Sequence, residues 1–551
     1  MKMKNILLSA LTLTFALTSC NEWLDVMPDN RAEIDTEEKV LKLLVSAYPE
    51  NFYGVVTEYA SDNVDDYGEN IPAYDRFSEQ LYYWEDVTES DNDDPKNIWE
   101  AHYGAITNAN QALVAIEEMG GATTSNLLAA KGEALLCRAY SHFILANIFC
   151  HAYNPATAEK ELGIPYMETA ETELNPKYER GTLAEVYRLI DKDLQEGLAL
   201  VNDGIYSVND GIYSVPKYHF NQKAAYTFAS RFYLFYGDWD KVIEYATLAL
   251  GPNPLEYMRD YGYLTSLPRD YQIIPKDYNN SNQKTNFLIM TSYSAAGMRY
   301  LPFGVYDRFG HGTVLMQTEI LNNAPWASFV PKAGGYMYQY IHKLPPMMYI
   351  GTTYDTAYFQ HTPYLFEYID PVAGIGYRRC NLAMITAEEA LLNRAEAYAM
   401  KKEYDKALAD INLWTNNTLD PTNALKKGGI TVTTNLTQEI IEKWAEDTPY
   451  YAEGTISPKK ALNSQVEAVE EGTQEAFVQT ILIARRLEFI ETGMRWFDIK
   501  RHGIEIHRRI VHPSGEVTDV TIKDFLPVND PRRAIQLPQD VITAGLEPNA
   551  R

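Results

Sequence analysis

Apolar residues recur at the three- and four-residue spacing of amphipathic helices along much of the chain. Two stretches share a more detailed pattern, because residues 133–139 read EALLCRA and residues 389–395 read EALLNRA. Residues 223–250 align with the second of these, with Ala225 at the position of Ala390. Each unit is predicted to be a helix, a tight turn and a second helix, which is the tetratricopeptide pattern. Because one pair cannot bury its apolar face alone, the units are expected to stack into a helical platform.

The same periodicity predicts further helices at residues 37–48, 97–118, 182–200 and 474–491. Thr182 is the expected N-cap of the third helix, and Glu185 three residues later completes a capping box. A perfect duplication, NDGIYSV, follows at residues 202–208 and 209–215. We interpret this duplication as a slippage in a surface loop and attach no function to it.

Residues 252–385 have a different texture, rich in Gly, Pro, Asn and Tyr and poor in helical periodicity. The segment from Gly335 to Tyr340 alternates like a short strand. Long loops on a rigid scaffold are where binding residues concentrate, so this insert is the predicted ligand-binding region. The predicted fold is therefore mainly α, a tetratricopeptide-like scaffold with a loop-rich aromatic insert. Its three regions are residues 20–251, 252–385 and 386–551.

The N-terminus reads as a secretory signal at residues 1–19. Its positive start and short apolar run end in small residues followed by Cys20, which resembles a bacterial lipoprotein lipobox. We expect cleavage before Cys20 and lipid attachment to it; an ordinary signal with an incidental cysteine is the alternative. Two or more acyl chains, at roughly 0.8 kcal/mol per buried CH₂, anchor a protein firmly. No later segment reads as a membrane span, so the protein is expected to sit on a membrane without crossing it.

Charge and cysteine usage narrow the function classes. The formal net charge of −27 repels phosphate backbones, so nucleic acid is not an expected partner. The same charge disfavours strongly acidic polysaccharides, unless a local basic pocket overrides it. Cys137, Cys150 and Cys380 show neither CxxC nor metal-ligand spacing, which argues against a disulfide framework or a zinc site. Cys137 and Cys150 are expected to be small buried hydrophobic residues.

No motif in the sequence indicates catalysis or a cofactor. GxSxG, HExxH, a P-loop and a strand-linked GxGxxG are all missing, and with 75 acidic residues a pair of carboxylates means little. An EF-hand loop starting at Asp91 fails, because Lys96 stands where Gly is needed and His102 where a bidentate Glu is needed. We therefore predict a non-enzymatic protein without cofactor or dedicated metal site. An adventitious calcium ion at residues 91–94 remains open.

Several blocks, in this order, resemble the SusD/RagB family of nutrient-binding lipoproteins. They are residues 21–28 (NEWLDVMP), 98–106 (IWEAHYGAI), 485–489 (RRLEF), 493–501 (GMRWFDIKR), 536–538 (QLP) and 545–549 (GLEPN). The resemblance covers essentially the whole chain. It implies a surface-exposed outer-membrane lipoprotein that captures an oligosaccharide and delivers it to a SusC-like TonB-dependent transporter. The motif residues themselves are expected to be structural: a charged network of Arg485, Arg486, Glu488, Arg495 and Asp498 beside the core residues Trp496 and Phe497.

A glycan site needs exposed aromatic rings for the apolar faces of sugars and polar groups for their hydroxyls. Trp84, ahead of an acidic loop, and Trp326, inside the insert, are the predicted ring platforms. The secondary candidates are Tyr306, Tyr336 and Tyr338, with Asp65 and Asp66 as hydrogen-bonding groups. For each of them, surface or core packing is the alternative role.

Two other functions stay open at this point. RagB-like members of the family serve peptide import, and a peptide site would favour backbone-pairing edges and apolar pockets over stacked rings. A scaffold that binds only the transporter is the other possibility.

Overall fold

The structure is a computed structural model, and it describes most of the chain from residue 34 onward. The described residues are 34–551 apart from 70, 72–74, 172–176, 209–210, 302–306, 322, 328–337, 352–354, 429, 453–455, 513–516 and 519–523. Cys20, the signal at residues 1–19, Tyr306 and Tyr336 lie outside the described residues.

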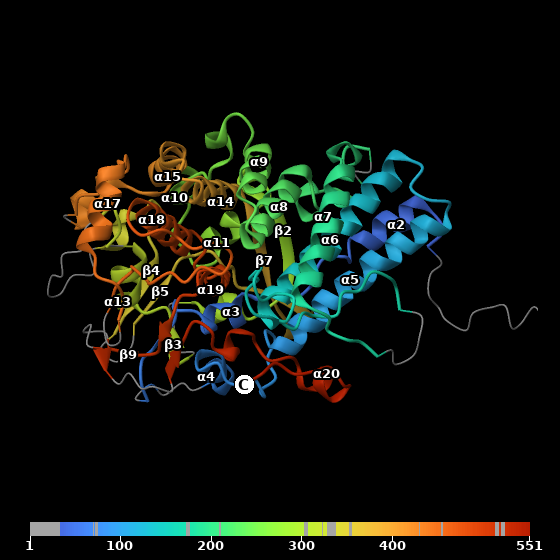
Figure 1. Cartoon of the computed structure of the whole chain (residues 1–551), viewed down its shortest axis with the longest axis horizontal. Helices are drawn as coiled ribbons and strands as arrows, with labels where there is room; N and C mark the ends of the chain where they lie inside the picture. The colour runs from blue at the N-terminus through green and yellow to red at the C-terminus, as the bar shows by residue number, and fades with distance from the viewer. Residues whose placement is uncertain are drawn as a thin grey trace, which may run out of the picture.

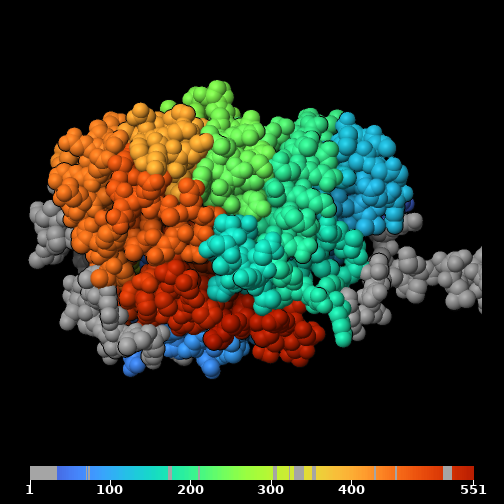
Figure 2. All heavy atoms as spheres, viewed as in Figure 1, coloured from blue at the N-terminus to red at the C-terminus, as the bar shows by residue number. Residues whose placement is uncertain are grey.

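Long helices packed side by side form the main body of the protein. They are α5 (Pro95–Glu118), α6 (Ser125–Phe149), α7 (Leu183–Leu200), α8 (Gln222–Tyr236), α9 (Trp239–Leu250), α14 (Ala387–Met400), α15 (Tyr404–Thr418), α17 (Gln438–Asp447), α18 (Thr473–Glu488) and α19 (Met494–Arg501). In Figure 1 most of them lie side by side across the upper part of the molecule, from α17 at the left to α6 at the right, while α5 slants below α6 and α19 lies near the middle. The colours of Figure 2 follow the same path from blue through green to orange, with the red C-terminal segment beneath. The predicted mainly α, tetratricopeptide-like scaffold is confirmed.

Shorter helices connect and flank this stack. They are α2 (Glu37–Leu44), α3 (Gly54–Ala60), α4 (Arg76–Tyr82), α10 (Tyr261–Ser266), α11 (Ile273–Tyr278), α12 (Ala296–Arg299), α13 (Thr313–Leu315), α16 (Pro421–Asn423) and α20 (Gln539–Thr543). The predicted helix at 37–48 is real but ends at Leu44, four residues earlier than expected.

Each of the three predicted repeat units begins with a helix, as expected. Residues 223–250 form α8 and α9, which meet at Gly237, whose left-handed φ of 87° ends the first helix. The second EALL motif begins α14, which packs against both α9 and α15. The first lies in α6, which ends at Phe149, whereas its packing partner α7 begins only at Leu183, behind the N-cap Thr182. The tight turn predicted for this unit is therefore wrong, because a long connection separates the two helices. The backbone N–H of Glu185 donates to Thr182 Oγ1 at 3.2 Å, so the predicted capping residue is confirmed.

The insert contributes most of the strands. These are β2 (Asn286–Tyr293), β3 (Phe309–Gly310), β4 (Met347–Ile350), β5 (Asp355–Tyr358), β6 (Leu365–Asp370) and β7 (Ile375–Thr386), besides β1 (Asp65–Asp66), β8 (Ile506–His507), β9 (Ile510–Val511), β10 (Val517–Thr518) and β11 (Phe525–Leu526). The sheet with the longest strands is antiparallel, with the strand order β2-β7-β6. The segment Tyr338–Ile341 is a 3₁₀ helix and not the expected strand. Its backbone pairs with the end of α15, since Asp420 N donates to Ile341 O at 2.8 Å.

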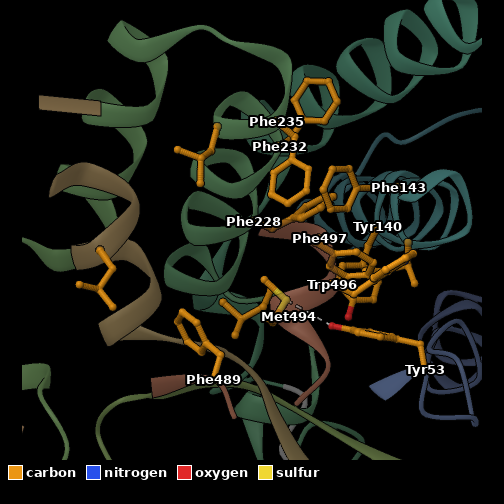
Figure 3. Packing of buried hydrophobic residues seen from close by; sticks show 14 of the residues in the cluster. Tyr53, Tyr140, Phe143, Phe228, Phe232, Phe235, Phe489, Met494, Trp496 and Phe497 are labelled. Carbon is orange, nitrogen blue, oxygen red and sulfur yellow. Dashed lines mark hydrogen bonds between the residues drawn. The ribbon is translucent and has the colours of Figure 1, made fainter. Parts of the chain in front are cut away.

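An aromatic core joins the C-terminal motif to the repeats (Figure 3). Phe143 of α6 and Phe235 of α8 meet edge to face with ring centroids 5.2 Å apart. Phe497 of α19 approaches Phe235 at 6.3 Å, and Trp496 beside it is fully buried. The predicted core role of Trp496 and Phe497 is therefore confirmed. Cys137 and Cys150 are buried free thiols of the same region, also as expected.

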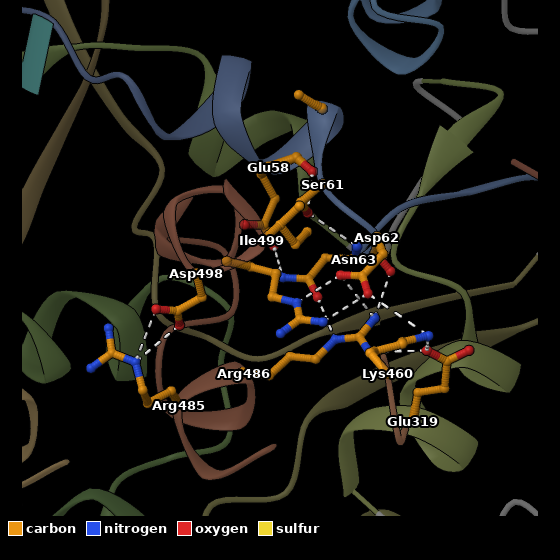
Figure 4. A network of polar contacts seen from close by, with 12 residues as sticks. Glu58, Ser61, Asp62, Asn63, Glu319, Lys460, Arg485, Arg486, Asp498 and Ile499 are labelled. Carbon is orange, nitrogen blue, oxygen red and sulfur yellow. Dashed lines mark hydrogen bonds and ion pairs between the residues drawn. The ribbon is translucent and has the colours of Figure 1, made fainter. Parts of the chain in front are cut away.

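The charged residues of the C-terminal motif form a buried network (Figure 4). Arg486 pairs with Glu319 at 2.9 Å, and Lys460 reaches the same carboxylate at 2.9 Å. Every one of these side chains is at least nine-tenths buried, so each charge needs the partner that it has. The predicted structural network is confirmed for Arg485, which pairs with Asp498 at 2.9 Å, and for Arg495, which pairs with Asp62 at 2.8 Å. The prediction is wrong for Glu488, whose carboxylate instead accepts from Trp414 Nε1 at 2.9 Å.

Both copies of the duplicated heptapeptide contribute a tyrosine to the core. Tyr206 from the first copy and Tyr213 from the second are both buried, and their rings meet edge to face at 5.0 Å. Both rings also lie against His219. The interpretation as a surface loop without a role is therefore wrong for these two tyrosines, because their rings pack into the interior.

Candidate ligand groove

Trp84 is a structural residue. It is 5% exposed, and its Nε1–H donates to Ala60 O at 2.8 Å. The guanidinium of Arg508 lies 4.2 Å from the ring centroid, and the same guanidinium stacks on Tyr82. With its ring enclosed in this way, Trp84 presents no face to a sugar, and the expected platform role is not supported by its position.

Trp326 is even more deeply enclosed. Only 1% of it is exposed, its Nε1–H donates to Leu321 O at 3.4 Å, and the ring of Trp414 lies 5.4 Å away. Two indoles in contact inside the protein stabilise the junction of the insert with α15 by burial of apolar area. The expected platform role of Trp326 is therefore not supported either.

The two predicted aspartates are inward-facing partners of arginines. Asp65 is 3% exposed and accepts from Arg509 Nε at 3.1 Å, and burial raises the pKa of this carboxyl group. Asp66 is fully buried and accepts two bonds of 2.5 Å from Arg308. Both carboxylates are used inside the protein, which removes them as hydrogen-bonding groups for a surface ligand. Tyr338 lies in the short 3₁₀ helix Tyr338–Ile341.

An open groove of about 700 Å³ lies elsewhere, between the first half of α5 and the β2-β7-β6 sheet. We call it the α5 groove. Residues of the loops before α3 and before α5 complete its lining. Its lining consists of Ser46, Tyr48, Glu50, Asn51, Asn92, Asn97, Glu100, Ala101, Gly104, Ala105, Asn108, Tyr293 and Tyr377.

One wall of the α5 groove is aromatic. Tyr377 of β7 is 50% exposed and meets Tyr293 of β2 edge to face, with centroids 5.3 Å apart. The guanidinium of Arg379 stacks on Tyr293 at 3.9 Å and donates to its hydroxyl at 2.7 Å. Glu367, opposite Tyr377 in the sheet, pairs with Arg379 in turn. This chain of contacts holds Tyr293 rigid and leaves the ring of Tyr377 open to solvent.

The opposite wall is the polar face of α5. This face carries only small residues at Ala101, Gly104 and Ala105. A side chain added at Gly104 would meet open space. Asn97 and Asn108 flank these small residues about one to two helical turns away on either side. Small residues between amides create a shallow trough in which a chain of polar rings can lie.

The start of α5 is fastened to the end of β2, which fixes the distance between the two walls. Asp94 caps the helix through Asn97 N at 2.7 Å. The neighbouring Asp93 accepts from Ala295 N at 2.8 Å and from the hydroxyl of Ser294. Burial raises the pKa of Asp93 to about 7. The acidic loop at residues 91–94, where calcium was considered, therefore positions the two walls of the groove. Among the described residues, no group of three or more possible metal ligands occurs.

A second groove, of about 680 Å³, lies beside α10. Tyr263, 43% exposed, marks its rim and donates to Asp277 at 2.9 Å. This bond ties the hydroxyl to the protein, and among the described residues no second ring of the groove stacks beside Tyr263. The α5 groove is therefore the stronger candidate. Neither groove was predicted from the sequence, although Tyr377 belongs to the tyrosine-rich insert that was.

Comparison with known proteins agrees with this architecture. Residues 22–234 match a family model, SusD-like, described as starch-binding associating with outer membrane. A SusD superfamily protein from Bacteroides thetaiotaomicron VPI-5482 is 18% identical, with a TM-score of 0.59 over 94% of this chain and 100% of that one. A SusD-like carbohydrate binding protein from Bacteroides vulgatus ATCC 8482 is 16% identical, with a TM-score of 0.56 over 92% and 95%. Among curated proteins, none matches.

The helical-repeat fold is shared with these SusD-like structures. Residues 22–234 also match the SusD-like family model, in line with the resemblance of the sequence blocks. In the part of the chain that the structure describes, no helix has the length and apolar character needed to span a bilayer.

Proposed function

We propose that this protein is a cell-surface glycan-binding lipoprotein. It captures an oligosaccharide in the α5 groove, performs no reaction on it, and delivers it to a SusC-like TonB-dependent transporter. The observation that carries this proposal is the open ring of Tyr377 above a trough lined by four asparagines. Several similar structures are of proteins described as SusD-like, and one of these is described as carbohydrate binding.

The groove offers the two kinds of contact that a sugar chain needs. The ring of Tyr377 matches the apolar C–H face of a pyranose, and such aromatic packing contributes about 0.5–1.5 kcal/mol beyond its buried area. Side-chain amides pair with hydroxyls at about 0.5–1.5 kcal/mol per hydrogen bond. One exposed ring and a few amides give moderate affinity, which suits a protein that passes its ligand on.

Calorimetry with a panel of plant, fungal and host glycans tests the capture step. Tyr377→Ala is expected to weaken saturable glycan binding roughly tenfold or more, since about 1.4 kcal/mol corresponds to a factor of ten. Tyr368→Ala is the matched control, because Tyr368 is 58% exposed on the same hairpin but faces the other side of the sheet. Binding to peptides alone, or glycan binding that is indifferent to Tyr377→Ala, would overturn the proposal.

The cellular part of the proposal has its own test. The full chain is expected to carry acyl label on Cys20 and to co-purify with a TonB-dependent transporter from outer membranes. Cys20→Ser should release the protein from the membrane while leaving glycan affinity in solution unchanged. Retention of the variant on the membrane, or absence of the transporter from the purified complex, would contradict anchoring and delivery respectively.

A further inference from the structure

Three of the four asparagines that line the α5 groove donate from Nδ2 to a backbone carbonyl. Asn51 Nδ2 donates to Asn92 O at 2.8 Å, and Asn97 Nδ2 donates to Asp91 O at 2.8 Å. Asn108 Nδ2 donates to Ser46 O at 2.7 Å. Each amide is oriented by a backbone carbonyl, which only an N–H group can approach so closely. Each of these amides keeps its Oδ1, which can only accept, and one N–H for other partners.

Asn51 makes this orientation most explicit. The residue is 7% exposed, and its Oδ1 has no hydrogen-bond partner among the described residues. A buried acceptor without a donor is costly, and a donor brought by a ligand would remove that cost. The requirement at this position is for a hydroxyl or N–H group.

Charged groups of the lining have the same character. Glu50 and Glu100 are exposed carboxylates, and no Lys, Arg or His belongs to the described lining. The cations nearby are already paired. Lys96 lies 2.9 Å from Asp540 and 3.7 Å from Glu100, and Arg379 is bound to Glu367 and Tyr293. An anionic ligand would meet two negative charges and oriented amide oxygens without a free countercharge.

We infer that the α5 groove takes uncharged oligosaccharides, whose hydroxyls donate to this acceptor-rich lining, and discriminates against glycans that carry carboxylate or sulfate groups. The inference deepens the proposed function and rests on it. The negative net charge of the protein disfavours acidic polysaccharides unless a local basic pocket binds them. The described lining of the α5 groove offers no such basic pocket.

The test compares one glycan in two charge states. The neutral oligosaccharide that binds best is oxidised at its primary hydroxyls to the uronate form, and both forms are titrated into the full protein. The oxidised form is expected to bind roughly tenfold more weakly at low ionic strength, and the difference should shrink in salt, which screens exposed charges. Equal or tighter binding of the oxidised form would overturn the inference.

Two variants locate the effect. The double change Glu50→Gln and Glu100→Gln is expected to narrow the difference in affinity between the neutral and the oxidised form severalfold. Glu118→Gln, at the far exposed end of the same helix, is the control and should change neither affinity. If only anionic glycans bind and Tyr377→Ala abolishes their binding, the proposed capture stands and this inference falls. If no glycan of either kind binds, the proposed function falls and takes the inference with it.

Discussion

The guanidinium of Arg394 in α14 and the carboxylate of Asp410 in α15 form two parallel hydrogen bonds, each 2.8 Å long. Arg138, the equivalent residue of the other EALL motif, makes the same pair with Asp193 of α7 at 2.6 and 2.7 Å. The arginine of the repeated motif therefore ties the first helix of a unit to the helix packed against it. This explains why the two copies share an arginine on a face that is otherwise apolar.

Removing this arginine should be costly because its partner is buried. Arg138 is 5% exposed and Asp193 is 1% exposed, so Arg138→Ala leaves a buried carboxylate without its cation. The expected loss in the free energy of unfolding is about 3–5 kcal/mol. Urea denaturation measures it. Arg188→Ala is the control, because Arg188 pairs with Glu185 on the exposed face of α7. This change should lower the free energy of unfolding by less than about 0.5 kcal/mol. Equal effects of the two changes would contradict the role of the motif.

The buried carboxyl group of Glu319 is expected to make the free energy of unfolding depend on pH in the acidic range. Burial alone would raise the pKa of its carboxyl group, but Lys460, Arg509 and Arg486 hold the pKa at about 2, below the ordinary 4.5. A carboxylate with a lowered folded-state pKa stabilises the protein fully above pH 4.5, and this contribution is lost as the pH falls toward 2. Urea denaturation across this interval should therefore show a falling free energy of unfolding.

The variant Glu319→Gln tests whether Glu319 causes this fall in the free energy of unfolding with falling pH. The variant is expected to be destabilised by about 3–5 kcal/mol at neutral pH, because three buried cations lose their shared anion. It should also lose much of the pH dependence between 4.5 and 2. Glu118→Gln, an exposed change of the same kind, should keep the slope. An unchanged slope in Glu319→Gln would show that other carboxylates produce it.

The helices and the charged motif were predictable because their signals are local. Periodicity marked α5, α7 and α18 to within a few residues, and Thr182 marked a helix start, since capping depends on residues three apart. The motif network was predictable in kind, because a cluster of arginines and acids in an apolar region must pair. Its partners Asp62 and Glu319 were not, because they come from segments hundreds of residues away.

The ligand groove could not be located from the sequence for the same reason. Tryptophan content identified Trp84 and Trp326, but their burial depends on Arg508 and Trp414, which lie far along the chain. Conversely, nothing in the sequence distinguishes Tyr377 from the other tyrosines of the insert. Only the folded sheet places Tyr377 beside α5. Composition reports which residues can stack on sugars, and only tertiary packing decides which rings remain open.

The two copies of the heptapeptide offer a matched pair of variants. Tyr213 donates its hydroxyl hydrogen to the buried Glu133 at 3.0 Å, whereas Tyr206 donates to the neutral carbonyl of Phe220 at 2.5 Å. Tyr213→Phe is expected to cost about 1.5–3 kcal/mol and Tyr206→Phe about 0.5–1.5 kcal/mol, because bonds to charged groups are stronger. Thermal or urea unfolding of both variants gives the comparison. A larger loss for Tyr206→Phe would refute the assignment of roles.

Gly493, the residue before α19, packs directly against α3. Its φ is +79°, and a Cβ there would lie 2.0 Å from Thr57 Oγ1 and 2.7 Å from Gly54 Cα. The N–H of Gly493 also donates to Glu58 at 3.1 Å, so the backbone cannot move away without breaking this bond. Gly493→Ala combines a left-handed backbone with a clash against another backbone, and should lower the free energy of unfolding by about 2–5 kcal/mol.

A second glycine separates the two causes of that loss. Gly120 has a φ of +96° with nothing within 4 Å of its added Cβ, so Gly120→Ala carries the backbone strain alone. It should cost about 1–2 kcal/mol. The difference between the two variants in urea denaturation measures the tightness of the α3–α19 contact. If Gly493→Ala costs no more than Gly120→Ala, the C-terminal motif is not locked against the N-terminal helix in the way its geometry requires.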